Sequence, residues 1–445
     1  MQAGRTPNSK LRSSVQLSAA DFLLSDLTTN GTTAGPPGSP PTQISRHGLA
    51  TLLAVLSSVG PFCIDAYLPS MGEIGRRLHA SPYAVQLTLT AYMIPFAVMM
   101  LWHGAISDAV GRRRIILWNF ALFGLATAGC AAAQSIGMLI AFRALQGMTG
   151  GAGMVVGRAI VRDRFQGHEA QRVMSRVSLT FAIAPAVAPV IGGWLQAWFG
   201  WRAVFIFVTV FAAVTWLVCR AVLTESLPVE RRQSLHPLFL ARSYWRVMTS
   251  GAFVTACVAL TCNFTGIFIY ISSAPVFLMQ HLGVSETGFL WLFGPLTTGS
   301  ATGAFFSGRA AGRLSARRTL GIAYAIMVAA VGANVVFHLV HRPELPWSVV
   351  PLYFFACGMG LAFPTVTLLA LDLFPTQRGL ASSCQSFIQT GGSALVAVIA
   401  PLVWGSVLSL ATTAAAALAV GIVALVLFFR AVHPAAVPGN LERNL

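Results

Sequence analysis

The sequence predicts an all-α integral membrane protein whose twelve transmembrane helices form two pseudo-symmetric six-helix bundles. Composition is the first reason: 56% of the residues are apolar and 9% are charged, whereas soluble domains carry about a quarter charged residues. The second is that the apolar residues gather in runs of about 20, the length that spans a bilayer core. The third is a short motif that recurs half a chain later, as in transporters built from repeats.

Twelve apolar runs give the order of the expected spans along the chain. They cover residues 48–72, 84–107, 115–133, 136–157, 177–198, 203–219, 247–273, 286–308, 319–339, 348–371, 380–407 and 409–429. We expect a disordered, polar tail over residues 1–47, which lack the apolar stretch of a signal peptide. We then expect a first six-helix bundle over 48–219 and a cytoplasmic linker over 220–246. A second six-helix bundle over 247–429 and a short cytoplasmic tail over 430–445 complete the chain.

The distribution of basic residues predicts the orientation in the membrane. With both termini placed in the cytoplasm, the cytoplasmic segments hold 24 of the 29 Lys and Arg residues and the outer segments hold four. This bias follows the positive-inside rule for bacterial membrane proteins. The net charge of +16 is therefore a signal of topology, and it argues against nucleic acid as a partner. The localisation expected is a bacterial inner, cytoplasmic, membrane.

The recurring motif lies in a turn between the second and third spans. Its first copy runs from Gly104 to Arg114, and a weaker copy runs from Gly308 to Arg318, 204 residues later. We expect the glycines to let the flanking helices approach, the acid to accept hydrogen bonds at a helix start, and the arginines to lie at the anionic lipid face. The motif residues of interest are Gly104, Asp108, Gly111, Arg112 and Arg113.

Two charged residues stand alone inside spans. Asp65 is the only acid well inside a span, and Arg143 is the only base within one. A charge in the bilayer costs about 2.5–3.5 kcal/mol on insertion scales, so each is a candidate for function. We predict that Asp65 loads and releases the coupled proton and that Arg143 assists it. The alternatives are a structural hydrogen bond for Asp65 and an architectural anchor for Arg143, and the sequence leaves open whether the two touch.

Other polar, aromatic and helix-breaking positions inside the spans complete the candidate sites. A proline and glycine run in the fifth span contains Pro185, Pro189, Gly192 and Gly193, which would bend the helix and admit a neighbour. Residues that could line an amphipathic substrate cavity, or serve as ordinary packing residues, are Tyr67, Tyr92, Gln146, Asn263, Phe268 and Tyr270.

No cofactor, metal or enzymatic activity is expected. The seven cysteines are scattered without a CxxC pair, and no HExxH or GxSxG motif occurs. The glycine-rich stretch from Gly147 to Gly157 follows an apolar helix and lacks the lysine of a phosphate-binding loop, so it fits close helix packing.

These motifs together resemble the major facilitator superfamily, and in particular its twelve-span drug:proton antiporters. The resemblance rests on the turn motif, on Arg143 with Gln146-Gly147, and on the run from Pro185 to Gly193. One difference is Ala184, which stands where many antiporters have glycine. The stretches from Pro61 to Pro69 and from Gly157 to Arg164 are similar to the bicyclomycin/chloramphenicol-resistance branch. The resemblance implies two six-helix bundles around a central cavity and a role for Asp65 and Arg143 in proton coupling. It also implies that the turn motif forms a cytoplasmic gate, whose residues are Gly104, Asp108, Gly111, Arg112 and Arg113.

The function expected is proton-coupled export of small amphipathic drugs, including antibiotics, by alternating access. The partners are then a small-molecule substrate, protons and the lipid bilayer, and we expect a monomer. The sequence leaves two alternatives open: a proton-coupled transporter of one metabolite, such as a sugar or amino-acid derivative, and a membrane sensor that transports nothing.

Overall fold

The computed structural model describes residues 45–165, 167–232, 237–311, 313–375 and 377–432, which all belong to one compact unit. The predicted N-terminal tail therefore lies outside the described residues except for its last three positions. Most of the predicted C-terminal tail and a short part of the linker also lie outside them. The described elements are all helical, as the sequence predicts.

The first half of the chain supplies six apolar spans, two of them built from consecutive helices. The first span is α2 with the short helices η2 and α3, and the fourth span is α6 continued by α7. The elements are α2 (Arg46–Tyr67), η2 (Leu68–Ser70), α3 (Met71–Arg77), α4 (Pro82–Val110), α5 (Arg112–Ala131), α6 (Ile136–Gly150), α7 (Ala152–Arg164), α8 (Gly167–Phe199) and α9 (Trp201–Val222).

A linker and six further spans follow. The linker holds η3 (Val229–Arg231) and α10 (Pro237–Met248). The spans are α11 (Gly251–Ser272) with η4 (Pro275–His281), α12 (Leu290–Ala310), α13 (Ala316–Val340), α14 (Val350–Asp372), α15 (Arg378–Ile399) with η5 (Ala400–Val403), and α16 (Val407–Ala431).

Helix starts follow local capping chemistry. Ser81, Ser135 and Ser406 each accept a backbone N–H of the first turn that follows. A serine oxygen at this position satisfies one of the helix's otherwise unpaired donors. The turn between α4 and α5 instead needs a left-handed residue, which Gly111 provides with a φ of 111°.

Length and composition make most of these helices able to cross a membrane. Among the described residues, ten spans are long and apolar enough, and the described apolar stretch of α8 runs over Ile183–Phe199. Large apolar side chains on the outward faces are correspondingly exposed, such as Leu125 at 69% and Val336 at 60%. Water would penalise this surface, whereas lipid tails would not. The chain is a multi-pass membrane protein.

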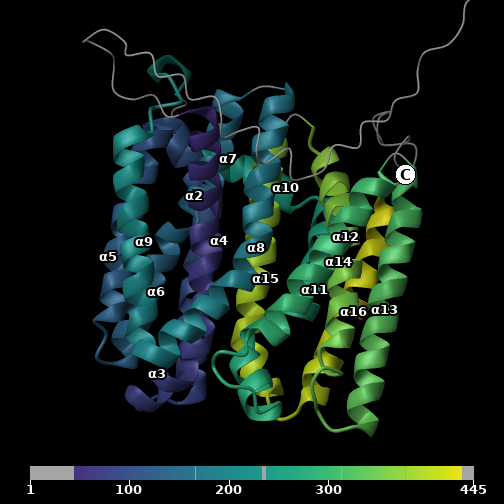
Figure 1. Ribbon diagram of the computed structural model, residues 1–445. Coiled ribbons are helices and arrows are strands. Elements are labelled where there is room, and N and C mark those ends of the chain that lie inside the picture. The colour runs from purple at the N-terminus through teal and green to yellow at the C-terminus, as the bar shows by residue number, and fades with distance from the viewer. Residues whose placement is uncertain (1–44, 166, 233–236, 312, 376, 433–445) are drawn as a thin grey trace, which may run out of the picture. The chain divides into compact units, whose positions relative to one another are not determined.

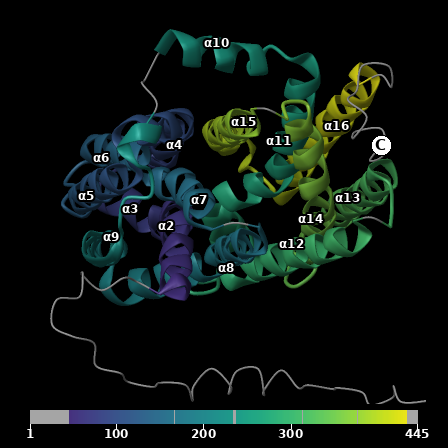
Figure 2. The same ribbon diagram turned by 90° about the horizontal axis from the view of Figure 1, so that it is seen from above.

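The two halves repeat the same set of helix contacts. In the first half α4 packs on α6, α5 on α9, and α2 on α7, α8 and α9. The equivalent pairs in the second half also pack: α12 on α14, α13 on α16, and α11 on α14, α15 and α16. Figures 1 and 2 show the two groups of helices, with α10 running between them along one edge. This confirms the predicted pseudo-symmetric pair of six-helix bundles.

Two helix pairs join the halves. α4 contacts α15, and α8 contacts α12. Under the repeat, α4 corresponds to α12 and α15 to α8, so the two junctions are equivalent. Gln86 on α4 donates to the Ala397 carbonyl at 3.0 Å, and a side chain at Gly193 on α8 would collide with the Glu286 backbone before α12. Glycine therefore allows the halves to approach at α8.

Candidate functional site

A buried arginine forms the centre of the first bundle. Arg143 on α6 is fully buried, and its guanidinium lies over two tyrosine rings, 4.6 Å from the centroid of Tyr67 on α2 and 4.4 Å from that of Tyr92 on α4. These distances are within the range of cation–π attraction. The rings replace part of the hydration that the charge loses on burial, and they tie α6 to α2 and α4.

Hydrogen bonds from Nη1 and Nε supplement these ring contacts of the guanidinium, whereas its buried Nη2 has no hydrogen-bond partner among the described residues. Arg143 donates to Gln146 Oε1 at 2.7 Å and approaches the Thr88 carbonyl at 3.4 Å. Gln146 in turn donates to Thr127 Oγ1 on α5 at 2.8 Å. The Tyr67 hydroxyl is bonded to the Thr88 hydroxyl, and the Tyr92 hydroxyl donates to the Gly60 carbonyl at 3.0 Å. The Arg143 network thus joins α2, α4, α5 and α6.

Asp65 lies on α2 but outside the Arg143 network. Its side chain is 7% exposed, and no hydrogen bond or ion pair of its carboxylate is found among the described residues. Cys63 and Tyr67, which approach Arg143, each lie two positions from Asp65. Two positions are about 200° around a helix, so Asp65 is on the opposite face. The structure thus separates the two charges that the sequence singled out.

The predicted gate residues meet at one end of the first bundle. Arg112 is 8% exposed and pairs with Asp108 one turn earlier, with an Nη1–Oδ1 distance of 2.5 Å. Its Nε also lies 3.2 Å from Asp163 Oδ2 at the end of α7. Arg113 donates to the backbone carbonyls of Leu223 and Arg220 after and within α9. Contacts to Gly104 are loose, because a methyl group added there would make ordinary contact with Val155.

Glu225 is a central member of this cluster that the sequence analysis missed. Its carboxylate accepts the backbone N–H groups of Arg112 at 2.9 Å and Arg113 at 3.3 Å, which are the first amides of α5. It also accepts the N–H groups of Ser226 and Leu227. A carboxylate at a helix start satisfies free donors and matches the helix dipole. The only sequence signal is an acid placed soon after the sixth span.

We expect Glu225→Ala to destabilise this turn. The change leaves four backbone donors without their acceptor, and one lost hydrogen bond to a charged group costs about 1.5–3 kcal/mol. The thermal midpoint of the purified protein in detergent should fall by several degrees, while Glu225→Gln should fall less because one acceptor oxygen remains. Glu230→Ala, at an exposed position of the same linker, is the matched control. Equal midpoints for Glu225→Ala and Glu230→Ala would contradict the capping role.

The linker helix docks on the first bundle. The Tyr244 hydroxyl on α10 donates to the Leu101 carbonyl of α4 at 2.6 Å. Burial raises the pKa of the Tyr244 phenol to about 12, so this hydroxyl keeps its proton and remains a donor at neutral pH.

The second copy of the turn motif is held differently. Ser315 caps α13 with its own side chain by accepting the Arg318 N–H at 3.4 Å. The first copy has Gly111 at that position, and the first amides of α5 are instead capped by the carboxylate of Glu225. Gly312, which replaces the acid of the first copy, lies outside the described residues.

The proline and glycine run of α8 lies against α2. Pro185 and Pro189 are inside the helix, with Pro189 buried. A side chain at Gly192 would collide with the Ala66 carbonyl of α2. This glycine therefore permits the close α2–α8 contact next to Asp65, as small residues do between membrane helices.

The predicted cavity residues all have partners inside the bundles. Tyr67, Tyr92 and Gln146 belong to the Arg143 network. In the second half Asn263 on α11 donates to the Tyr324 hydroxyl of α13 at 2.7 Å, and Asn334 of α13 donates to Tyr270 of α11 at 2.7 Å. Phe268 stacks on Phe264. These contacts match the packing alternative for each residue, and their role in substrate binding stays a prediction. Among the described residues, no cluster of metal-binding side chains was found.

A family profile accounts for this combination of repeat, junctions and buried charges. Residues 50–397 match the family described as Major Facilitator Superfamily. The chain belongs to the Major Facilitator Superfamily. The resemblance drawn from its motifs is thereby confirmed, and the fold of this transporter superfamily explains why two six-helix halves repeat the same contacts.

Several bacterial proteins are similar to this superfamily member. It is 33% identical to an uncharacterized MFS-type transporter, YdgK, of Bacillus subtilis, over 82% of this chain and 90% of the relative. It is 29% identical to multidrug resistance protein D of Escherichia coli, over 80% and 88%. It is 30% identical to the bicyclomycin resistance protein homolog of Haemophilus influenzae, over 62% and 69%. These relatives agree with the predicted branch.

A solved structure supports the superfamily fold independently. A bacterial homolog of the human lysosomal transporter Spinster, in an inward-facing and occupied conformation, aligns with a TM-score of 0.67 at 15% identity, over 88% of this chain and 97% of that one. At this identity the likeness concerns the fold alone.

Proposed function

We propose that this protein exports small amphipathic drugs across the bacterial inner membrane in exchange for protons. The observation that carries the proposal is Asp65, a buried carboxylate without an ionic partner among the described residues, in a transporter of this superfamily. A carboxylate inside a span is expensive unless it serves a pathway or a proton relay. The names of the relatives, which include a multidrug and a bicyclomycin resistance protein, support drugs as the substrate class.

Separation from Arg143 suits Asp65 to this task. An aspartate paired directly with an arginine would remain ionised over most of the pH range. Cys63 and Tyr67, which approach Arg143, lie on the other face of α2 from Asp65. Arg143 can therefore stabilise the packing of the bundle without forming an ion pair with Asp65. Loading and unloading a proton at Asp65 would then change the relative stability of two arrangements of the halves, which is how a ligand drives alternating access.

We further propose that the cluster around Arg112 and Glu225 is a cytoplasmic gate. The basic residues of the turns support a cytoplasmic location for this end of the bundles, by the positive-inside rule, with both termini on the same side. Asp108, Arg112 and Asp163 tie the α4–α5 turn to α7, and Glu225 ties it to the linker. Opening on this side would have to break some of these contacts.

The two halves would divide the work. Among the described residues of the second half, no acid lies at the depth of Asp65, and Asp372 at the end of α14 pairs with Arg378. We therefore propose that proton chemistry belongs to the first half, whereas Asn263, Phe268 and Tyr270 shape the substrate cavity from the second.

A drug-susceptibility panel tests the proposal. A pump-deficient bacterial host with and without the gene would be exposed to chemically diverse antibiotics, and inhibitory concentrations would be measured. Export of drugs raises these concentrations for several unrelated compounds, and a protonophore removes the effect. No change for any compound, with the protein present in the membrane, would instead favour a dedicated metabolite carrier or a sensor.

A further inference from the structure

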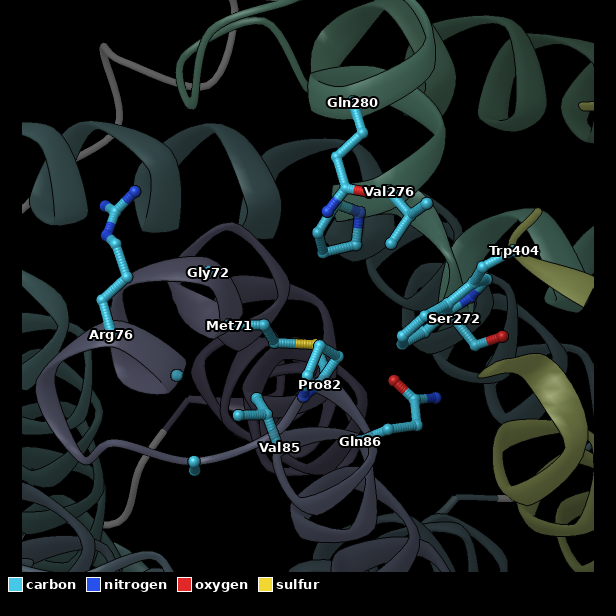
Figure 3. A pocket seen from close by; sticks show the side chains of 13 residues that line it. Met71, Gly72, Arg76, Pro82, Val85, Gln86, Ser272, Val276, Gln280 and Trp404 are labelled. Carbon is cyan, nitrogen blue, oxygen red and sulfur yellow. The ribbon is translucent and has the colours of Figure 1, made fainter. Parts of the chain in front are cut away.

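A pocket lies between the two halves at the end opposite the gate cluster. Its cavity volume is about 320 Å³, within the size range of small-molecule sites. The first half lines it from α3 and the start of α4, with Met71, Pro82 and Val85, and the second half lines it from η4 and the segment after η5, with Val276 and Trp404. Figure 3 shows these side chains facing one another across the pocket.

One buried polar atom in the wall lacks a partner. Gln86 is 1% exposed, and its Nε2 donates to the Ala397 carbonyl at 3.0 Å. Because a carbonyl can only accept, this bond fixes which end of the amide is nitrogen. The remaining atom, Oε1, has no hydrogen-bond partner, and Figure 3 shows the amide reaching toward Ser272 and Trp404. A buried acceptor without a donor is costly, so the pocket favours a molecule that brings one.

The opposite wall is held rigid. The Trp404 indole donates to Ser273 Oγ at 2.8 Å, and the Trp404 carbonyl lies 2.9 Å from His281 Nε2. Both bonds are made within the second half: the first orients the indole ring, and the second holds the backbone of Trp404. A fixed aromatic wall lowers the entropy cost of binding a flat apolar molecule.

The charges around the pocket restrict the chemical class of ligand further. Arg76 is the only charged residue among its lining residues, and no acid lines it. A cation would meet a like charge without a compensating carboxylate. An anion would gain little, because Arg76 is exposed and solvent screens its charge. We propose that this pocket is a second binding site, outside the Arg143 network and the gate, for an uncharged, mainly apolar molecule with one N–H or O–H donor. The donor bonds Gln86 Oε1 while the apolar body packs between Met71, Val85 and Trp404.

The test compares two probes that differ by one hydrogen-bond donor. Binding of 2-phenylindole, which has an N–H, and of 1-methyl-2-phenylindole, which lacks it, would be measured on the full chain in lipid nanodiscs, with empty nanodiscs subtracted. Wild-type protein should prefer the N–H compound about tenfold, the size of one hydrogen bond to a buried acceptor. In Gln86→Leu the two probes should bind with about equal affinity. Continued binding of the methylated compound would show that the pocket is still formed in this variant.

Three further variants complete the experiment, and two of them are matched controls. Trp404→Ala should weaken both probes together, because it removes the apolar wall and leaves the acceptor. Gln134→Leu and Trp347→Ala make the same chemical changes at exposed positions and should leave both affinities unchanged. An equal affinity for the two probes in the wild type, or a preference that survives Gln86→Leu, overturns the proposal. Since binding is measured without transport, failure of the drug-export proposal would leave this result standing.

Discussion

Asp65→Asn is expected to abolish proton-coupled export while leaving the protein folded. Asparagine has nearly the same shape as aspartate and cannot titrate, so the exchange of a proton would be lost and the packing on α2 kept. Each proton moved across 100 mV supplies about 2.3 kcal/mol, and without it efflux against a gradient has no driving force. We expect inhibitory concentrations in the susceptibility assay to return to those of the host without the gene.

Substrate-induced proton release measures the same step directly. In lightly buffered detergent solution the wild type should release protons when a neutral drug is added, and Asp65→Asn should release none while still binding the drug. Asp372→Asn, which removes a carboxylate already paired with Arg378, is the control and should behave as wild type. Undiminished proton release from Asp65→Asn would place coupling at another residue.

Arg143→Ala is expected to cause the largest loss of stability of the changes considered. Removing a large, fully buried side chain leaves a cavity, and comparable truncations cost about 2–5 kcal/mol. The change also leaves Gln146 Oε1 buried without its donor, which adds about 1–3 kcal/mol. Arg143→Lys should recover only part of this, because an ammonium group cannot match the planar guanidinium between two rings and the Gln146 amide.

An exposed arginine offers a matched control for this change. Arg202 also lies over an aromatic ring, 4.2 Å from the centroid of Trp201, and donates to the Ala133 carbonyl at 2.8 Å. Because Arg202 is exposed, Arg202→Ala should cost less than about 1 kcal/mol. Thermal midpoints of both variants in the same detergent decide the matter. If Arg143→Ala and Arg202→Ala lower the thermal midpoint by similar amounts, burial of the Arg143 network does not add to the stability of the protein.

The sequence by itself determined the spans, the half-chain repeat and which charged residues are candidates for function inside the membrane. Hydropathy determines where a chain crosses lipid because each residue contributes locally, and this needs no knowledge of neighbours. Asp65 and Arg143 stood out for the same local reason, since each is the only charge of its sign deep in a span. The motif from Gly104 to Arg114 was likewise visible as a short, continuous pattern.

Only the tertiary structure decided which side chains meet. The partners of Arg143 outside its own helix come from α2 and α4 and lie up to 80 positions away. Their contact depends on how the helices are rotated, which hydropathy does not specify. The separation of Asp65 from Arg143 depends on the same rotation of α2. Glu225 reaches the start of α5 from 113 positions away, and Gln86 faces a pocket whose other wall lies in the second half. Such contacts arise from packing between distant segments, so no local pattern of residues could reveal them.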